Sequence, residues 1–459
     1  MTSTYDSAAA RNLSLDSLRQ ILTDLGVDRI LLKALAPNDN SKNQPYLGKD
    51  MSVLNVIPTG HISESDSTSK KQRIGKKGKK LTAPIEFYWV SPNGVALPAP
   101  ESKLILYPQY SEVRFSGFMK RSEADVSEWM NPYKSGRNEG RYLVFGIAGA
   151  KVFGFLVIPG TRLATDLKNV PRVREIGVLF EIALAAAQEK VDAKYVLLRE
   201  LRRIHELGWI QGKRLQQLGK YVDCNNSNCG GYTLEAELGV LPNGVAEPDF
   251  MGWEVKQYQV PTFTSAAGKP LTLMTPEPSG GFYREEGVEA FVRKFGYPDK
   301  NGKEDRLNFG GVHRFGQRHS TTALELDLVG ADLRTGKFDP GGAIVLRNAG
   351  GEIAASWSFS KLLEHWKRKH SQAVYVPAQV RKNGSRYYSY GSQVWLGEGT
   401  DFMRLLKAIG SGSVYYDPGI KLVDASSTKP TTKRRSQFRI NTQKLSALYD
   451  RYAHIDVTD

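Results

Sequence analysis

The chain has 459 residues, enough for two or three domains, and its 40% hydrophobic and 24% charged residues are the balance of a globular protein. Lys and Arg number 63 and Asp and Glu 48, so the formal net charge of +15 favours a polyanionic partner such as nucleic acid. The longest apolar stretch is too short to span a bilayer, and residues 1–20 lack the basic start and apolar core of a signal peptide, so we expect a cytoplasmic protein.

The first part of the chain predicts a mostly β domain over residues 1–167. Residues 1–24 have the apolar spacing of a short helix, with Ser14 or Asp16 as its N-cap. Aromatic and β-branched runs broken by Gly and Pro follow, which is typical of antiparallel strands. Residues 63–80 are polar and then strongly basic, and predict a mobile loop that is either a solvated insertion or an arm that grips phosphate.

The second part, residues 168–459, predicts an α/β domain. Residues 171–219 contain VREIGVLFEIALAAAQ and AKYVLLRELRRIHELGWIQGKRLQQLG, which have helical periodicity. Strands and helices mix after Gly230. Two cysteines, Cys224 and Cys229, are too few for a structural zinc site without histidines nearby. We expect two free thiols, because a small disulfide loop is disfavoured in a reducing cytosol.

The stretch EPDFMGWEVKQ, residues 247–257, carries the strongest chemical signal. In a strand, Glu254 and Lys256 project to the same side, and Asp249 precedes them at a turn. Two converging carboxylates resist ionisation unless a cation intervenes, and Mg²⁺ takes oxygen ligands. Such a site can stabilise the charge that builds on a scissile phosphate, with Lys256 orienting the attacking water. The alternative is an amphipathic strand that carries a solvated ion pair.

This stretch and the helix predicted before it resemble the MvaI/BcnI family of restriction endonucleases, in the PD-(D/E)XK nuclease superfamily, with MutH-like nicking enzymes as more distant relatives. The resemblance extends loosely over about 275 residues and rests on four short motifs: Thr233-Leu234-Glu235, Leu238-Gly239, Pro248-Asp249-Phe250 and Glu254-Val255-Lys256. It implies a mixed central sheet flanked by helices and a Mg²⁺-dependent endonuclease that acts on double-stranded DNA.

The resemblance also implies roles for individual residues. Asp249 and Glu254 correspond to the metal ligands and Lys256 to the catalytic lysine. Glu235 corresponds to an upstream carboxylate that supports the metal or its waters; the alternative is an ordinary carboxylate on a helix surface. The relatives act as monomers on short, GC-rich, nearly palindromic sites. The resemblance therefore implies a monomer, a CCNGG-like site and a cognate methyltransferase that protects the host.

A second group of residues predicts DNA contacts in the C-terminal part. KPTTKRRSQFRI places Arg435, Gln437 and Arg439 on one face if it forms a strand, where arginine forks can read guanine or hold phosphate. The resemblance implies that this region and YYDPGIK carry base recognition, which adds Asp417 and Lys421. The alternative for the basic segment is a solvated turn.

GGVHRF adds two further candidates, His313 and Arg314, which follow a pair of glycines. A backbone without side chains at such a turn can approach a duplex closely. We therefore expect these two residues to contact DNA.

Residues 35–58, LAPNDNSKNQPYLGKDMSVLNVIP, are similar to the start of EcoRII-type N-terminal effector domains, which have a β-pseudobarrel fold. The similarity rests on Asn38-Asp39, Asn43-Gln44 and Ile57-Pro58, although a histidine usually stands at the position of Asn43. It implies that this domain binds a further or modified DNA copy. Its candidate contacts are Lys33, Asn38, Asp39, Gln44 and Arg114. The alternative is a β domain that binds protein or only adds phosphate contacts.

Two other functions stay open. One is a modification-dependent or MutH-like nicking endonuclease, which a pair of methylated and unmethylated substrates would separate. The other is a DNA-binding regulator that does not cleave. The intact set of Asp249, Glu254 and Lys256 argues against the regulator.

Overall fold

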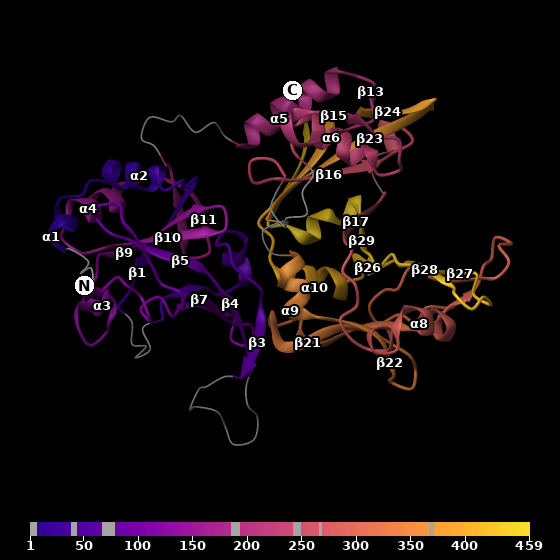
Figure 1. Cartoon of the computed structure of the whole chain (residues 1–459), viewed down its shortest axis with the longest axis horizontal. Helices are drawn as coiled ribbons and strands as arrows, with labels where there is room; N and C mark the ends of the chain where they lie inside the picture. Colours follow the sequence, from indigo (N-terminus) through magenta and orange to yellow (C-terminus); the bar gives the residue numbers. More distant parts are fainter. Residues whose placement is uncertain are drawn as a thin grey trace. The chain divides into compact units, whose positions relative to one another are not determined.

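The computed structural model describes residues 7–37, 44–66, 79–184, 193–241, 249–265, 269–366 and 371–459. The chain divides into two compact units, Met1–Val191 and Asp192–Asp459 (Figure 1). Within the described ranges, no helix is long and apolar enough to cross a membrane.

The first unit is built on two sheets (Figure 1). The seven-stranded sheet has the order β11 (Arg172–Ile176), β12 (Leu179–Ile182), β1 (Arg29–Leu35), β9 (Arg141–Ala148), β10 (Lys151–Val157), β5 (Glu86–Val90), β6 (Ala96–Pro98). The five-stranded sheet has the order β2 (Tyr46–Gly48), β8 (Glu112–Ser116), β7 (Lys103–Tyr107), β4 (Lys79–Pro84), β3 (Ser63–Asp66). The expected mostly β first part is confirmed, and closure into a pseudobarrel stays a prediction.

Aromatic side chains join the two sheets in one core. Phe87 on β5 and Phe115 on β8 belong to different sheets, and their ring centroids lie 5.1 Å apart. Only Ile85 separates β4 from β5, so the chain passes directly from one sheet to the other. A Cβ on Gly154 would come within 2.1 Å of the Phe87 ring, so this glycine makes room for the ring. The two sheets therefore share a tightly packed aromatic interior.

The helices of this unit are short: α1 (Ser7–Asn12), α2 (Leu15–Asp24), α3 (Ser127–Met130) and α4 (Arg162–Asn169), with the 3-10 turns η1 (Met51–Asn55) and η2 (Ser135–Arg137). The hydroxyl of Ser14 accepts the N–H of Ser17 at 3.1 Å. This bond satisfies one of the free amides at the start of α2, so the N-cap predicted at Ser14 is confirmed.

Residues 172–182 form a β-hairpin, and the helix that their apolar spacing predicts is wrong. β11 pairs with β12, and β12 pairs with β1, where Ile182 lies opposite Ile30. A short apolar run fits either structure, and here pairing with the edge of the sheet decides. Because this hairpin belongs to the first unit, the boundary falls after Val191 rather than at the predicted residue 167.

The predicted loop of residues 63–80 is shorter than expected, because its two ends are strands. β3 and β4 pair antiparallel, with Ser63 opposite Thr82 and Asp66 opposite Lys79. Opposite charges in such cross-strand positions favour the pairing. Residues 67–78 lie outside the described residues, so both interpretations of the basic segment stay open.

The central sheet of the second unit is mixed. β16 (Glu254–Gln259) runs parallel to β23 (Gln372–Asn383). The remaining strands pair antiparallel in the order β13 (Ile210–Gln211), β24 (Ser385–Tyr390), β23, β25 (Gln393–Glu398), β30 (Arg451–Asp456). The expected mixed sheet is therefore confirmed.

Two helices cover one face of this sheet: α5 (Ala193–Glu206) and α6 (Cys229–Glu237). Leu201 of α5 and Leu234 of α6 join Val255 of β16 and Val374 of β23 in one buried cluster. Burial of such aliphatic side chains is the main source of stability for a helix packed on a sheet. The helix predicted to run on to residue 219 ends at Glu206, and short strands follow it.

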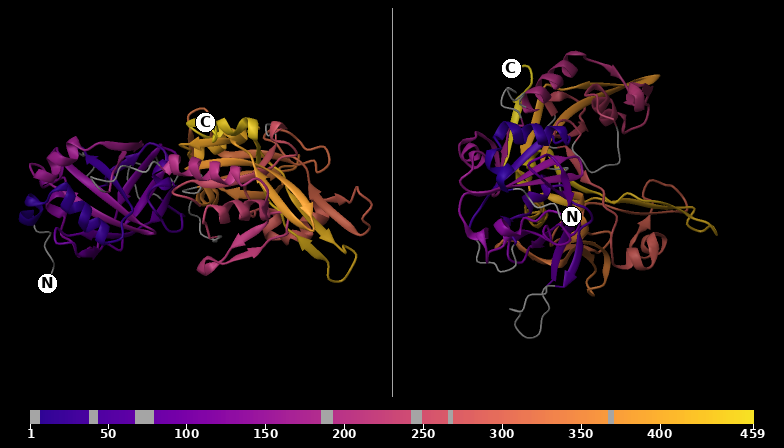
Figure 2. Two further views of the ribbon diagram at one scale, coloured as in Figure 1. Left: turned by 90° about the horizontal axis from the view of Figure 1, so that it is seen from above. Right: turned by 60° about the vertical axis from the view of Figure 1, so that its left-hand side comes forward.

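The rest of the second unit consists of smaller sheets and helices (Figure 1, Figure 2). The sheets are β14 (Lys213–Leu215) with β15 (Tyr221–Asp223); β17 (Pro270–Met274), β29 (Phe438–Asn441) and β26 (Val414–Tyr416); β18 (Tyr297–Pro298), β19 (Arg306–Gly310), β27 (Gly419–Val423) and β28 (Thr431–Lys433); and β20 (Glu325–Asp332), β21 (Lys337–Arg347) and β22 (Ile353–Ser358). The helices are α7 (Phe282–Glu285), α8 (Gly287–Phe295), α9 (Phe359–Trp366) and α10 (Phe402–Gly410), with η3 (Gln217–Gly219), η4 (Phe263–Ser265) and η5 (Thr442–Leu448).

Candidate active site

A tight turn sets the start of β16. The N–H groups of Phe250 and Trp253 each donate to the carbonyl oxygen of the other, at 2.9 and 2.8 Å. Met251 and Gly252 between them have φ angles of 46° and 86°, the left-handed pair that a two-residue hairpin turn needs. Glycine adopts this conformation freely, whereas Met251 adopts it at a cost in free energy. The turn fixes the direction in which the chain enters β16.

Asp249 is held beside the first residues of β16. Its Oδ2 accepts the N–H of Val255 at 2.9 Å. In the described part of the sheet, β23 is the sole partner of β16, so the other side of the strand is open to Asp249. The carboxyl group of Asp249 therefore lies next to the residue that follows Glu254.

Glu254 and Lys256 project from the same face of β16, as predicted. Oε1 of Glu254 and Nζ of Lys256 lie 2.9 Å apart, and the two side chains are 3% and 17% exposed. Val255 between them faces the apolar cluster instead. The alternation of the strand thus separates a polar face from a packing face. A solvated ion pair, the alternative interpretation of this motif, does not fit the burial of Glu254.

A carboxylate that is so deeply buried loses its hydration and needs compensating partners. Lys256 supplies an opposite charge. Tyr375 lies opposite Lys256 in β23, and its hydroxyl is 2.6 Å from the hydroxyl of Tyr449. Burial is the main cause that raises the pKa of both tyrosines, and the negative charge of Glu254 raises it further. Both hydroxyl groups therefore remain protonated at neutral pH.

The donor set fits Mg²⁺. This ion binds through one or two carboxylates, and retains several waters or substrate oxygens as its other ligands. Asp249 and Glu254 provide two such carboxylates at the start of one strand. Within the described ranges, no cluster of three or more His, Cys, Asp or Glu side chains could enclose a metal ion. An ion held by only two carboxylates would keep its other positions for water and phosphate oxygens.

Glu235, the expected supporting carboxylate, is half-buried on α6. Its neighbour Leu234 is fully buried in the cluster that contains Val255, so α6 packs directly against the strand of Glu254. The expected helix around Glu235 is confirmed, and its role at the metal stays a prediction.

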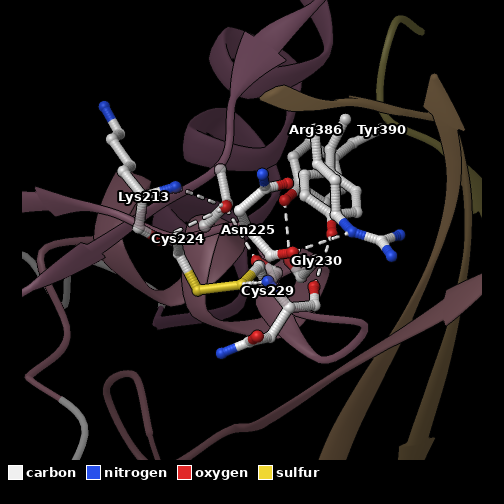
Figure 3. Close-up of a disulfide and its surroundings, with 10 residues drawn as sticks. Lys213, Cys224, Asn225, Cys229, Gly230, Arg386 and Tyr390 are labelled. Carbon is white, nitrogen blue, oxygen red and sulfur yellow. Dashed lines mark hydrogen bonds between the residues drawn. A yellow bond between two sulfur atoms is a disulfide. The ribbon is translucent and has the colours of Figure 1, made fainter. Parts of the chain in front are cut away.

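Cys224 and Cys229 form a disulfide, with Cα atoms 5.7 Å apart, so the prediction of two free thiols is wrong (Figure 3). The prediction relied on the usual redox state of the cytosol, and the spacing of the two residues did not reveal that the loop folds back on itself. Cys229 is the first residue of α6, and the hydroxyl of Tyr390 on β24 donates to the carbonyl of Gly230 at 2.7 Å. The bridge therefore fastens the start of the helix that carries Glu235.

Arg439 and Asp417, two predicted DNA contacts, form an ion pair. Nη1 of Arg439 and Oδ2 of Asp417 lie 2.7 Å apart, and the side chains are 23% and 21% exposed. An arginine oriented by a carboxylate in this way keeps further N–H groups in a fixed geometry. The structure therefore brings these two candidates together.

The prediction that Arg435, Gln437 and Arg439 share one face of a strand is wrong, because only Arg439 lies in a strand. β29 begins at Phe438, so Arg435 and Gln437 precede it. Gln437 is buried, and its side-chain oxygen accepts a hydrogen bond from the hydroxyl of Thr272 at 3.1 Å. Arg435 is exposed. The packing of Gln437 removes it from any surface that could meet DNA.

Lys421 lies on β27, opposite Asn308 of β19 and Lys433 of β28. Its neighbours Ile420 and Leu422 are buried on the other face. The N–H of Gly419, also on β27, donates to the carbonyl of Arg435 at 2.9 Å. Lys421 and Arg435 thus belong to the same small sheet region.

His313 is fully buried, and its burial contradicts the predicted contact between its side chain and DNA. Its Nε2 lies 2.9 Å from the hydroxyl of Thr322, and burial lowers the pKa of the imidazole to about 3. Arg314 is half-buried: Nη1 donates to the carbonyl of Gly412 at 2.6 Å, and the guanidinium lies over the ring of Tyr415 at 4.6 Å. Only Arg314 of this pair keeps a partly accessible side chain.

Three candidates of the first unit, Lys33, Gln44 and Arg114, line one cavity of about 250 Å³. Arg114 forms an ion pair with Glu112, and burial lowers the pKa of Lys33. Asn38 and Asp39 lie outside the described residues. Of the five predicted DNA contacts in the first unit, the three that the structure describes therefore lie around one cavity.

The sequence did not predict Tyr375 and Tyr449 as residues of the site. They are 74 positions apart, and each lies in an ordinary apolar segment. Alternation places Tyr375 on a face of a strand, but only the register of β23 against β16 places it beside Lys256.

The site therefore brings together a buried Glu–Lys pair and an aspartate held at the same strand end. The family model of the MvaI/BcnI restriction endonuclease family matches residues 198–449. The chain belongs to this family, whose class is that of site-specific deoxyribonucleases.

Solved structures that are similar to the chain include two of restriction endonuclease MvaI. One is a restriction endonuclease MvaI–cognate DNA substrate complex, 20% identical, covering 57% of this chain and 98% of that chain with a TM-score of 0.41. The other is restriction endonuclease MvaI in the absence of DNA, 19% identical, covering 58% and 99% with a TM-score of 0.33. At these TM-scores neither likeness carries a structural argument. Among curated proteins, none matches the chain.

Proposed function

We propose that the protein is a type II-like restriction endonuclease that hydrolyses phosphodiester bonds of double-stranded DNA with Mg²⁺. The observation that carries this proposal is the buried contact between Glu254 and Lys256, with Asp249 fixed at the same strand end. A purely structural ion pair would gain little from such burial, because desolvation offsets its attraction. Membership of a restriction endonuclease family agrees with a catalytic use of the three residues.

The residues divide the chemistry between them. Asp249 and Glu254 would hold Mg²⁺. A bound Mg²⁺ ion would stabilise the negative charge that develops on the scissile phosphate. Lys256, whose side chain is 17% exposed, can orient the attacking water. In-line attack by water requires no covalent intermediate and leaves 5′-phosphate and 3′-hydroxyl ends.

The proposed substrate is duplex DNA with a short, CCNGG-like site. The net charge of +15 supports binding to the phosphate backbone in general. Arg439 with Asp417, and the nearby Lys421 and Arg435, are the proposed sources of sequence preference, because arginine reads guanine and aspartate accepts from cytosine. Arg314 would add a further contact.

The first unit is proposed to bind a further or modified DNA copy through Lys33, Gln44 and Arg114. That these three residues share one cavity supports a common role. A monomer in solution, a cytoplasmic location and a cognate methyltransferase complete the proposal.

Cleavage of unmethylated genomic DNA tests the proposal. Wild type and Lys256→Ala are compared with Mg²⁺ and with EDTA. Discrete fragments that vanish with EDTA and with the variant are expected, and sequencing of the ends then gives the site. Cleavage confined to methylated DNA, or to one strand, would replace the proposal by a modification-dependent or nicking enzyme. Binding of DNA in Ca²⁺ without any cleavage in Mg²⁺ would replace it by a non-cleaving regulator.

A further inference from the structure

On the face of the central sheet that carries Glu254, the residues opposite Glu254 on the next two strands are small. Ala373 lies opposite Glu254, and Gly397 lies opposite Ala373. The ring of Tyr449 fills the space above Gly397, because a Cβ on this glycine would come within 2.3 Å of a ring carbon. Tyr449 therefore stands over the sheet in the row that begins with Glu254.

The hydroxyl of Tyr449 meets the hydroxyl of Tyr375, 2.6 Å away. Tyr375 rises from the same face, opposite Lys256, and the two tyrosines are 0% and 3% exposed. Two hydroxyl groups carry two hydrogens, and their mutual bond uses one of them. The second hydrogen is buried and requires another acceptor, since a buried donor without one costs free energy. The carboxylate of Glu254 is a charged acceptor on this face.

We propose that the Tyr375–Tyr449 hydroxyl pair is a positioning element for the Glu254 carboxylate, to which it donates its second hydrogen directly or through one bridging water. The proposal rests on the proposed function, in which Glu254 is a metal ligand. Lys256 contacts one oxygen of this carboxylate, and a second hydrogen bond would fix its orientation. A ligand with a fixed orientation binds a metal ion more tightly, because less ordering is needed on binding.

The direct test is metal binding without DNA. Mn²⁺ serves as the probe, because carboxylate sites for Mg²⁺ also accept it, and the signal of free Mn²⁺ in electron paramagnetic resonance reports binding. Tyr449→Phe and Tyr375→Phe keep the rings and remove one hydroxyl each. Either variant is expected to weaken Mn²⁺ binding about 10-fold. In cleavage assays the same variants should need more Mg²⁺ for half-maximal rate, with an unchanged KM for DNA.

Tyr452→Phe is the matched control. Tyr452 lies opposite Gly397 on β30, and within the described residues its buried hydroxyl has no hydrogen-bond partner. Removal of this hydroxyl should leave Mn²⁺ binding unchanged. A general loosening of the sheet would instead affect all three tyrosine variants alike, and melting temperatures of the variants would show it.

Wild-type Mn²⁺ affinity in Tyr449→Phe and Tyr375→Phe would overturn the inference. An equal loss in Tyr452→Phe, or no Mn²⁺ binding by the wild type, would overturn it as well. A wild type that binds Mn²⁺ but cuts no DNA would instead refute the proposed function. In that case the Mn²⁺ affinities of the variants still decide the role of the tyrosine pair.

Discussion

The ammonium group of Lys256 lies 2.9 Å from Oε1 of Glu254, a carboxylate that is 3% exposed. This contact joins the predicted catalytic lysine to a predicted metal ligand. Loss of either partner leaves the other charge without its nearest opposite charge, so the pair affects both stability and activity.

Lys256→Ala should abolish or greatly reduce cleavage. We expect the rate to fall at least about 100-fold, the usual effect of removing a group that orients or activates the attacking water. Single-turnover cleavage rates measure it. Lys337→Ala, which removes an exposed lysine at the start of β21, is the control and should cleave normally. Wild-type cleavage by Lys256→Ala would contradict the assigned role.

Arg439→Ala should weaken binding to the specific site more than binding to random DNA. An arginine that reads a base contributes about 1–3 kcal/mol of discrimination, which corresponds to roughly 10- to 100-fold in affinity. Arg439→Lys should not restore it, because lysine lacks the planar guanidinium that can pair with Asp417 through Nη1 and still present further N–H groups. Gel-shift titrations in Ca²⁺ on both DNAs provide the measurement. Arg202→Ala, at an exposed position of α5, serves as the control. Equal losses on the two DNAs would indicate a phosphate contact instead.

Reduction of the Cys224–Cys229 disulfide should destabilise the second unit. Closing such a short loop lowers the entropy of the unfolded chain, which stabilises the folded state by about 2 kcal/mol. Denaturant unfolding with and without reductant measures the change. Cys224→Ser should unfold at the reduced wild-type midpoint and should not respond to the reductant. If reductant leaves the wild-type midpoint unchanged, the bridge contributes no stability.

Acid should destabilise the second unit through His313. Burial lowers the pKa of this imidazole to about 3, whereas an unfolded histidine has a pKa near about 6.5. The unfolded chain therefore binds more protons between these values, and stability is lost as the pH falls below about 6.5. The free energy of unfolding should fall by about 1.4 kcal/mol per pH unit from this group alone.

His313→Gln should remove this component of the pH dependence. Burial also lowers the pKa of His319 and His365, so the wild type must be compared directly with the variant between pH 5 and 7. Parallel curves for the two proteins would show that His313 does not titrate as expected.

Local patterns correctly predicted how the side chains of β16 are arranged. The alternation of Glu254, Val255 and Lys256 is a local property of a strand, and the structure confirms it. Ser14 likewise caps its helix through a bond three residues away. Such features depend on neighbours in the sequence, which is why a single chain reveals them.

The features that could not be predicted depend on packing between distant parts of the chain. The apolar spacing of residues 172–182 fits a helix as well as a hairpin, and only the open edge at β1 selects the hairpin. His313 follows two glycines but packs inward, and Gln437 is captured by Thr272. Tyr449 packs over Gly397 and meets Tyr375 of β23, and neither contact gave a sequence signal.

The parallel pairing of β16 with β23 also has a consequence during synthesis. Glu254 meets its cross-strand neighbour Ala373 only after most of the chain has left the ribosome, and Tyr449 arrives later still. Contacts between such distant segments form late, because a long loop must close first. A nascent or prematurely terminated chain therefore lacks the strand pairing that places Tyr375 beside Lys256.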